Sequence, residues 1–221
     1  ISFKVPFGTL YPEFIPLILF QGVGFVSVAA WIMRQQRDTT VSAIAGEIES
    51  RTQSLLDPLT GLLNRRGLAE KAETMRHAPT YKALFYLDLD GFKQINDRLG
   101  HGVGDEILSQ VARRLTTCIP EASICRMGGD EFIIVADCNS RYTASVIGSC
   151  LIDSISQPYV SSTGLVSAGV SIGICLFDPV TVDLERAMLQ ADEALYRAKS
   201  DGRGRAVLYE EVEQTKARTM A

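Results

Sequence analysis

The spacing of apolar and polar residues changes twice along the chain and divides it into three parts. Residues 14–33 contain no charged side chain, and as a helix this run is about long enough to cross a hydrocarbon core of roughly 30 Å. Residues 34–56 follow, with apolar residues at helical spacing and polar residues between them. From residue 57 onward, short apolar runs alternate with amphipathic segments, which is typical of mixed strands and helices.

The alternating part predicts a globular domain over residues 57–210. A period near 3.6 residues indicates helices, and short runs rich in β-branched and aromatic residues indicate strands. Gly128-Gly129 is typical of a hairpin turn between two of these strands, and Asn64 is the expected cap of the first helix. This order of elements indicates an α+β or α/β fold with helices around a central sheet. The expected helices span 65–77, 92–99, 103–118, 141–156 and 183–200, and the expected strands span 81–89, 123–127, 131–136, 164–177 and 206–209.

The uncharged run 14–33 predicts a transmembrane helix. Aromatic residues lie near both of its ends, and Arg34 and Arg37 follow it directly. Because basic residues favour the cytoplasmic side of a membrane, we expect the rest of the chain at the cytoplasmic face of the inner membrane. The alternative is an apolar helix buried in a soluble domain, which Pro16 and Gln21 favour.

The segments on either side of this run complete the expected organisation. Residues 1–13 are interpreted as the extramembrane end of a longer chain, since the sequence starts with Ile rather than Met. Residues 34–56 predict a helical connector, either a short parallel coiled coil or an ordinary amphipathic helix. Asp57-Pro58 is expected to end it, because the residue before a proline disfavours the helical region. Residues 211–221 are a C-terminal tail.

Composition narrows the possible function classes. The chain has 22 Lys and Arg against 26 Asp and Glu, a formal net charge of −4, which argues against a nucleic-acid-binding protein. A nucleotide ligand stays compatible with this charge, because its phosphates need only a few local cations and a metal ion. The five cysteines form no CxxC pair and lie in or beside apolar runs, so we interpret them as reduced thiols used as small core residues.

Two acidic elements lie at expected strand ends. Asp88 and Asp90 are two residues apart, so a strand places both carboxylates on one face at its C-terminal end. Asp130 and Glu131 follow the two glycines of the expected hairpin turn, where adjacent acids repel each other unless a cation compensates them. Oxygen ligands of this kind suit Mg²⁺. Two such elements converging on a metal pair would stabilise the attacking and leaving oxygens of phosphoryl or nucleotidyl transfer.

Four sequence blocks in the domain together resemble the GGDEF family of diguanylate cyclases. The resemblance covers roughly residues 55–210 and implies a palm-like nucleotidyl cyclase fold, with a mainly antiparallel sheet flanked by helices. It also implies that the domain condenses two GTP molecules into cyclic di-GMP with Mg²⁺ or Mn²⁺. The blocks are DPLTGLLNRR (57–66), LDLDGFKQINDRLGHGVGDEIL (87–108), RMGGDEF (126–132) and ADEALYRAKSDGRGR (191–205).

The resemblance also implies roles for individual residues. Asp88, the backbone carbonyl of Leu89 and Glu131 match the family's metal ligands. Asp130 is expected to contact metal or to help deprotonate the ribose 3′-hydroxyl. Four further residues are expected to bind the triphosphate through helix-start backbone amides or through positive charge: Phe92, Lys93, Lys199 and Arg203.

Three positions match the family's base pocket. Asn96 and Asp105 match the guanine-reading residues, since a carboxylate accepts from guanine N1–H and N2–H₂ together. Adenine lacks that donor pair, so Asp105 favours GTP over an adenine-containing product. His101 either lines this pocket or is a loop residue bonded to backbone. Lys199 and Arg203 also have a structural alternative, as cations that complement a helix dipole.

Two further expectations follow from the resemblance. Cyclic di-GMP has two-fold symmetry, so we expect a homodimer through the catalytic domains and the connector helix. The alternative is a non-catalytic module that binds GTP or cyclic di-GMP in a membrane signalling protein.

Many relatives carry an inhibitory RxxD motif just before the signature, and no residue here matches its arginine or aspartate, so we predict no product site of that type. We expect Arg126 to face the active site. The four corresponding positions are Ile119, Pro120, Glu121 and Ala122.

Overall fold

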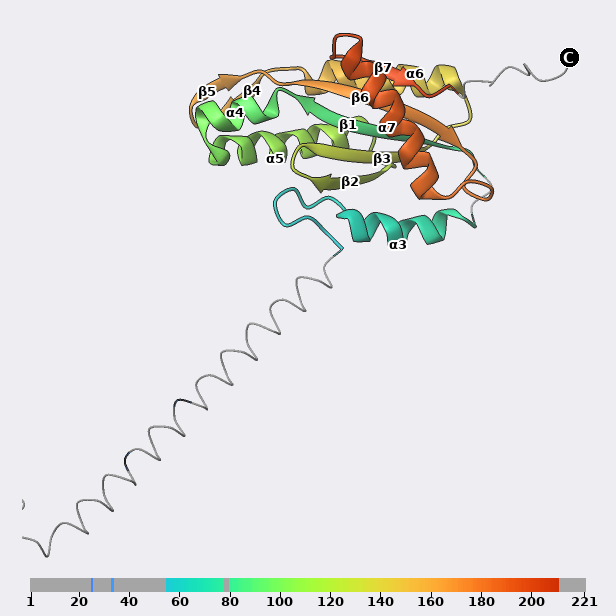
Figure 1. Cartoon of the computed structure of the whole chain (residues 1–221), viewed down its shortest axis with the longest axis horizontal. Coiled ribbons are helices and arrows are strands. Elements are labelled where there is room, and N and C mark those ends of the chain that lie inside the picture. Colours follow the sequence, from blue (N-terminus) through green and yellow to red (C-terminus); the bar gives the residue numbers. More distant parts are fainter. Residues whose placement is uncertain (1–24, 26–32, 34–54, 78–79, 211–221) are drawn as a thin grey trace, which may run out of the picture. The chain divides into compact units, whose positions relative to one another are not determined.

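The computed structural model describes residues 55–77 and 80–210, and in addition the single residues Phe25 and Met33 (Figure 1). No helix in the part of the chain so described is long and apolar enough to cross a membrane. The predictions for the N-terminal segments and the tail therefore stay predictions. The segments that lie wholly or mostly outside the described residues are 1–13, 14–33, 34–56 and 211–221.

A five-stranded sheet with the strand order β2-β3-β1-β6-β7 forms the centre of the domain. The central strand β1 pairs antiparallel with both β3 and β6, and β2 pairs antiparallel with β3. Only β7 is parallel to its neighbour, β6. The predicted α+β fold with a mainly antiparallel sheet flanked by helices is therefore confirmed. The strands are β1 (Lys82–Asp90), β2 (Ser123–Gly128), β3 (Glu131–Asp137), β6 (Gly169–Phe177) and β7 (Ala206–Leu208).

Helices cover both faces of the sheet because its strands are apolar on both sides. In β1, the buried side chains of Phe85 and Leu87 face the core beneath α4, α5 and α6. The alternate residue Leu84 points to the opposite face, where it packs in the core beneath α3 and α7. Figure 1 shows α7 crossing the sheet and α3 beside β2. These helices are α3 (Arg65–Met75), α4 (Phe92–Leu99), α5 (His101–Cys118), α6 (Arg141–Ile155) and α7 (Leu184–Ser200).

The position of α7 is fixed by a close approach to β6. A Cβ atom at Gly173 would lie 1.9 Å from the carbonyl oxygen of Ala191, so only glycine allows this contact. Ala187, Ala191 and Ala194 are 0% exposed on the same side of α7. Small residues at both surfaces therefore seat the helix on the sheet and fix where its C-terminal end, with Lys199, must lie.

One expected strand, 164–177, is divided in the structure. Its first part is β5 (Gly164–Val166), which pairs with β4 (Tyr159–Ser161) in a separate two-stranded sheet. The Glu106 carboxylate of α5 accepts a hydrogen bond from the Ser162 backbone at 2.7 Å and holds this hairpin against the helix. The continuous apolar run hid this division, because periodicity alone does not show where a strand leaves one sheet for another.

The last two residues of the expected helical connector, Leu55 and Leu56, are not helical. Leu56 forms an isolated bridge with Leu63, and the Leu55 carbonyl accepts a hydrogen bond from the Asn64 backbone at 2.9 Å. The prediction of a helix reaching residue 56 is therefore wrong, because these bonds commit both residues to the loop around Asp57. Asn64 caps α3 with its side chain, as expected.

The five cysteines are all free thiols. Cys125, Cys138 and Cys175 are buried, in agreement with their predicted use as small core residues. Cys118 and Cys150 are exposed on α5 and α6, so the prediction is wrong for these two. Their helices turn those positions toward solvent, although the local sequence around them is apolar.

Candidate active site

The two acidic elements predicted from the sequence meet at the C-terminal end of β1. Asp88 lies directly opposite Glu131 in the register of β1 and β3. The Leu89 backbone N–H donates to the Asp130 carbonyl oxygen at 3.3 Å, which holds the hairpin turn against the strand end. The structure therefore brings together the four residues that the sequence assigned to metal binding.

Negative charge accumulates at this strand end. Burial raises the pKa of Asp130 above its ordinary value, and the neighbouring charge of Asp88 raises it further. The Tyr86 hydroxyl donates to Glu131 Oε2 at 3.4 Å. Burial and the charge of Glu131 raise the pKa of Tyr86 to about 12. The contribution of the neighbouring carboxylates to these shifts indicates that an added positive charge would stabilise the site.

The donor chemistry of this strand end fits a divalent cation, which prefers carboxylate and carbonyl oxygens. Asp88, Glu131 and Asp130 are the residues that would hold Mg²⁺ or Mn²⁺ here, and such an ion would polarise phosphate oxygens. Among the residues that the structure describes, no three carboxylate, imidazole or thiolate groups are arranged to hold an ion as they stand. Lys199 Nζ lies 2.7 Å from Asp88 Oδ2 and supplies positive charge at this strand end.

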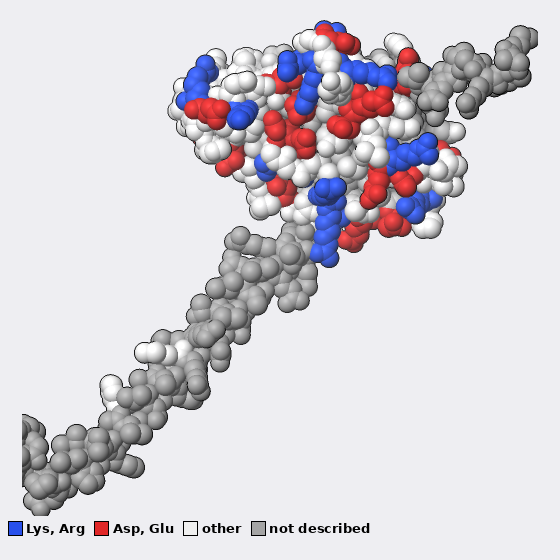
Figure 2. All heavy atoms as spheres, viewed as in Figure 1, with Lys and Arg blue, Asp and Glu red and all other residues white. Residues whose placement is uncertain are grey.

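Both predicted phosphate-binding cations are paired with carboxylates of β1. Beside the Lys199–Asp88 pair, Arg203 Nε lies 3.8 Å from Asp90 Oδ1. Arg203 has a backbone φ of 63°, a region that residues other than glycine seldom adopt. Its side chain is 63% exposed, so it can reach a ligand in solvent. Figure 2 shows basic and acidic side chains side by side around the C-terminal end of α7.

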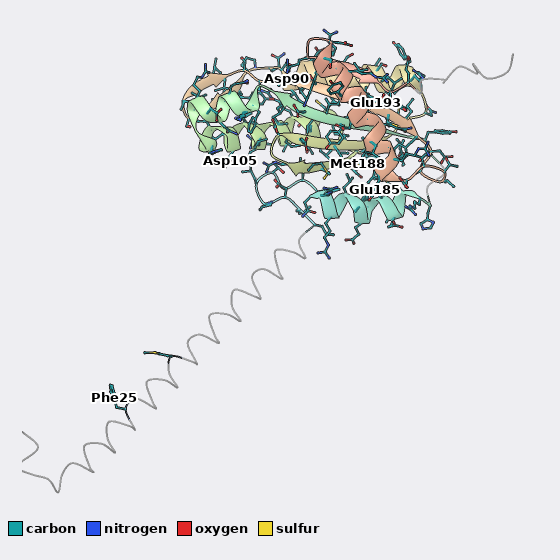
Figure 3. All side chains as sticks on the ribbon, in the orientation of Figure 1. Phe25, Asp90, Asp105, Glu185, Met188 and Glu193 are labelled. Atoms are coloured by element: carbon teal, nitrogen blue, oxygen red, sulfur yellow. The ribbon has the colours of Figure 1, made fainter. Side chains whose placement is uncertain are left out.

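Asp90 has a role that sequence reasoning missed. Its carboxylate accepts hydrogen bonds from Ser171 Oγ at 2.9 and 3.0 Å and from the Gly204 backbone at 3.1 Å. Asp90 therefore joins β1, β6 and the turn after α7, and Figure 3 labels it at this junction. A signal for this was present, since Ser171 is a lone polar residue among apolar neighbours and is 0% exposed.

The start of α4 offers backbone rather than side-chain contacts to a ligand. Gly91, with a φ of 77°, precedes the helix. Phe92 is 5% exposed and its ring belongs to the core, whereas Lys93 is exposed. The structure thus buries the Phe92 ring and exposes the Lys93 side chain, and the predicted binding of a triphosphate at this helix start stays a prediction.

The predicted base-reading residues lie on α4 and α5. Asn96 Oδ1 is buried and has no hydrogen-bond partner. It packs against α5 so closely that a Cβ at Gly104 would lie 2.0 Å from it. His101 and Asp105 are exposed on the first turns of α5, and Figure 3 labels Asp105 there. An unpartnered buried acceptor beside an exposed carboxylate is an arrangement that a ligand with hydrogen-bond donors would satisfy.

Arg126 holds the turn that carries Asp130, and its positive charge acts to lower the pKa of that carboxyl group. Its guanidinium donates to the Gly129 carbonyl oxygen at 3.1 and 2.8 Å, and to both carboxylate oxygens of Asp57 at 3.2 Å. Gly128 and Gly129 have φ values of 145° and 55°, which allow the tight turn that Arg126 holds. Asp57 is 69 residues away in sequence, so no local pattern could have predicted the pair.

The comparison with known families decides the classification. Residues 54–205 match the family described as "Diguanylate cyclase, GGDEF domain". This chain belongs to the GGDEF family.

Several relatives of this GGDEF domain are known. Diguanylate cyclase DgcP of Escherichia coli is 36% identical over 174 residues, which are 76% of this chain and 49% of DgcP. MucR of Pseudomonas aeruginosa, named a bifunctional diguanylate cyclase/cyclic di-GMP phosphodiesterase, is 30% identical over 205 residues, 88% of this chain and 30% of MucR. The chain thus spans less than half the length of either relative. The GGDEF domain of TpbB (YfiN) from Pseudomonas aeruginosa superposes with a TM-score of 0.62 at 34% identity, covering 70% of this chain and 94% of that domain.

Proposed function

We propose that this GGDEF domain is a diguanylate cyclase that condenses two GTP molecules into cyclic di-GMP and two pyrophosphates. The observation that supports the proposal most strongly is the cross-strand pairing of Asp88 and Glu131, with Asp130 in the adjoining turn. Carboxylates in this arrangement, next to the basic end of α7, suit nucleotidyl transfer with a divalent cation. Relatives named diguanylate cyclases support the same reaction.

Residues of this chain would act in each step of the condensation of two GTP molecules. The 3′-oxygen of each GTP forms a bond to the α-phosphorus of the other. Each time, the bond from that phosphorus to the oxygen that bridges to the β-phosphate breaks, and one pyrophosphate leaves. Asp130, whose pKa is raised by burial and by Asp88, is suited to accept the 3′-hydroxyl proton. Asn96 and Asp105 would orient guanine, and the start of α4 would bind phosphate oxygens through its free N–H groups.

Substrate binding would rearrange the ion pair at the end of α7. Lys199 now neutralises Asp88 at 2.7 Å. With nucleotide bound, Lys199 would pair with phosphate and release the Asp88 carboxylate to the divalent cation. Both charges keep a partner of opposite sign in this exchange, which avoids leaving either one uncompensated.

The symmetry of the product extends the proposal to assembly and location. One domain binds one GTP, so two domains must face each other about a two-fold axis, which makes the homodimer the active form. We propose that residues 14–33 anchor the chain in the inner membrane with the catalytic domain in the cytoplasm, and that residues 34–54 connect the two. Membrane fractionation of cells carrying the full chain tests the anchor, and recovery without detergent in the soluble fraction would contradict it.

Product analysis tests the reaction directly. The full chain is incubated with Mg²⁺ and an equal mixture of GTP and ATP, and the products are identified by mass. We expect cyclic di-GMP alone. Replacing Asp130 and Glu131 together by Ala should reduce turnover far more than tenfold, since lost charge stabilisation of a transition state costs several kcal/mol. The control Glu121→Ala changes an exposed carboxylate outside the site and should retain activity; turnover within tenfold of wild type in the double variant would contradict the assignment.

A second candidate is a module that binds GTP or cyclic di-GMP without turnover. The observation that favours it is the Lys199–Asp88 ion pair, which already neutralises the principal carboxylate of the site. Calorimetric binding of GTP without any product, in a protein whose dimer is intact, would favour this function over the cyclase.

A further inference from the structure

A groove lies between α3 and α7, beside the catalytic carboxylates. Its volume is about 500 Å³, within the range of roughly 300–1,000 Å³ that is usual for small-molecule sites. Its floor is formed by side chains of the sheet and its walls by the two helices. The lining residues that carry the argument are Arg65, Leu68, Tyr86, Glu131, Met188 and Asp192.

The groove combines an apolar body with a few polar groups. Leu68 lies buried at its base, and Met188 and Leu189 project from α7, the latter 71% exposed although it is a large apolar side chain. The ring of Tyr86 is also part of the lining. Apolar walls with a small number of polar groups are the usual composition of sites for organic ligands.

The charges around the groove are predominantly negative. Glu185 and Asp192 are exposed on α7, and Glu131 enters from β3. Arg65 on α3 is the single basic residue of the lining. Figure 3 labels Glu185 and Met188 toward the α3 end of α7, with Glu193 farther along the helix. Three carboxylates against one guanidinium favour a positively charged ligand, and an aromatic ring favours it further.

We propose that this groove is a second ligand site, for a small organic cation with an apolar body. The ammonium or guanidinium group would lie near Asp192 and Glu185, and the apolar part would pack on Leu68 and Met188. Because Glu131 belongs both to this lining and to the catalytic carboxylates, a bound cation would alter the charge of the active site. That coupling rests on the proposed cyclase activity, whereas binding does not.

Binding is tested with three probes of one shape and different charge. 2-Phenylethylamine, 2-phenylethanol and 3-phenylpropanoate are titrated against the full chain in non-ionic detergent, and binding is followed by saturation-transfer NMR of the probe. A fragment of this size binds with a Kd on the order of 1 mM. We expect the amine to bind about tenfold more tightly than the alcohol, because the charge is desolvated only in part, and the carboxylate not to bind.

Matched variants locate the site. The double variant Glu185→Gln/Asp192→Asn keeps the shape of both side chains and should remove the preference for the amine. Glu193→Gln is the control, since Glu193 pairs with Arg197 and is not part of the lining. Ala69→Phe on α3 places a ring in the groove and should abolish binding of both the amine and the alcohol, with the fold checked by circular dichroism.

The outcomes separate this proposal from the proposed function. Equal affinity of amine and alcohol, amine binding that survives Ala69→Phe, or no binding of the amine at 20-fold the expected Kd would each overturn the site. If binding follows the pattern above while the amine leaves cyclic di-GMP production unchanged, the site stands and its coupling through Glu131 is wrong. A protein that makes no cyclic di-GMP can still bind the amine. Amine binding without any cyclic di-GMP production would therefore contradict the cyclase proposal and leave the groove proposal standing.

Discussion

Arg126 and Asp57 form a nearly buried ion pair that joins the Gly128-Gly129 turn to the loop at the start of the described domain. Their side chains are 12% and 17% exposed, and the same guanidinium holds the Gly129 carbonyl. Asp57 is further fixed by hydrogen bonds from the Thr60 backbone at 2.9 Å and the Thr60 hydroxyl at 2.6 Å. A displacement of the loop around Asp57 would therefore reach the turn that carries Asp130 and Glu131.

Removal of this pair should lower both stability and activity. Arg126→Ala leaves Asp57 unpaired, and we expect a loss of about 2–3 kcal/mol in the free energy of unfolding together with reduced cyclic di-GMP production. The matched control is Arg141→Ala, because Arg141 and Glu210 form a pair with side chains 60% and 71% exposed, which should contribute at most about 0.5 kcal/mol. Urea unfolding measures both, and equal effects of the two variants would contradict the role of the Arg126 pair.

The same pair should make stability depend on acid pH. Burial alone would raise the pKa of Asp57, but hydrogen bonds from Thr60 and the charge of Arg126 lower it below its ordinary value of 3.8. Because the folded-state pKa is below the unfolded one, ionised Asp57 stabilises the fold above about pH 4, and this stabilisation is lost as the pH falls through the folded-state pKa. The stability difference between wild type and Asp57→Asn should therefore shrink on acidification. A difference that stays constant down to about pH 2.5 would contradict this linkage.

For Asp130 we expect ionisation to have the opposite effect on the stability of the fold. Burial and Asp88 raise its pKa in the folded state, so the ionised side chain opposes folding at neutral pH. Asp130→Asn should increase the melting temperature at pH 7 by on the order of 1–3 °C while it reduces turnover. The gain should vanish below the unfolded-state pKa, near pH 4, where Asp130 is neutral in both states. Scanning calorimetry without nucleotide or divalent cation measures this, and a lower melting temperature at pH 7 would show that Asp130 stabilises the fold instead.

Two neighbouring glycines of α5 offer a test of the base pocket. A Cβ at Gly104 would lie 2.0 Å from Asn96 Oδ1, whereas a Cβ at Gly102 would meet nothing within 4 Å. Gly104→Ala should displace the Asn96 side chain and raise the Kd for GTP about tenfold, since a base-edge hydrogen bond is worth roughly 1–2 kcal/mol. Gly102→Ala should bind GTP as wild type does. Calorimetric titration of both variants with GTP measures the two Kd values. Equal affinities would mean that Asn96 does not contact the base.

We expect weak product inhibition, because the positions that carry an inhibitory motif in many relatives hold other residues in this chain. Ile119 and Ala122 pack partly against the core, and Glu121 is exposed, so none of these side chains offers the planar guanidinium that binds phosphate bidentately. Progress curves with added cyclic di-GMP should show no submicromolar inhibition. Submicromolar inhibition that Glu121→Arg leaves unaltered would place a product site elsewhere on the domain.

The sequence predicted those elements that depend on residues close together in the chain. The strongly apolar and aromatic run of β1 placed Asp88 near its end, and the glycine pair predicted the hairpin that carries Asp130 and Glu131. The family resemblance added the roles of Lys199 and Arg203, for which charge at a helix end was ambiguous. The structure shows that both are engaged by carboxylates of β1.

The contacts that escaped prediction are those between distant segments. Arg126 meets Asp57 across 69 residues, and neither residue type specifies its partner through a periodic pattern. The β4–β5 hairpin was missed for a related reason, since β5 continues into an apolar run that reads as one strand and β4 has only three residues. The groove between α3 and α7 depends on how two helices are seated on the sheet, which no single segment encodes.

The junction at Asp90 has a consequence for the order in which the molecule is assembled. Its carboxylate binds Ser171 and the Gly204 backbone, 81 and 114 residues farther along the chain. Contacts of such long sequence separation close only after the intervening segments have been synthesised, and their loop-closure entropy must be offset by other contacts. The basic turn after α7 therefore reaches its position only when the last strands have joined the sheet. A chain that is still without these last segments thus lacks Lys199 and Arg203, the cations that pair with Asp88 and Asp90, so the charge balance at this strand end is a property of the completed domain.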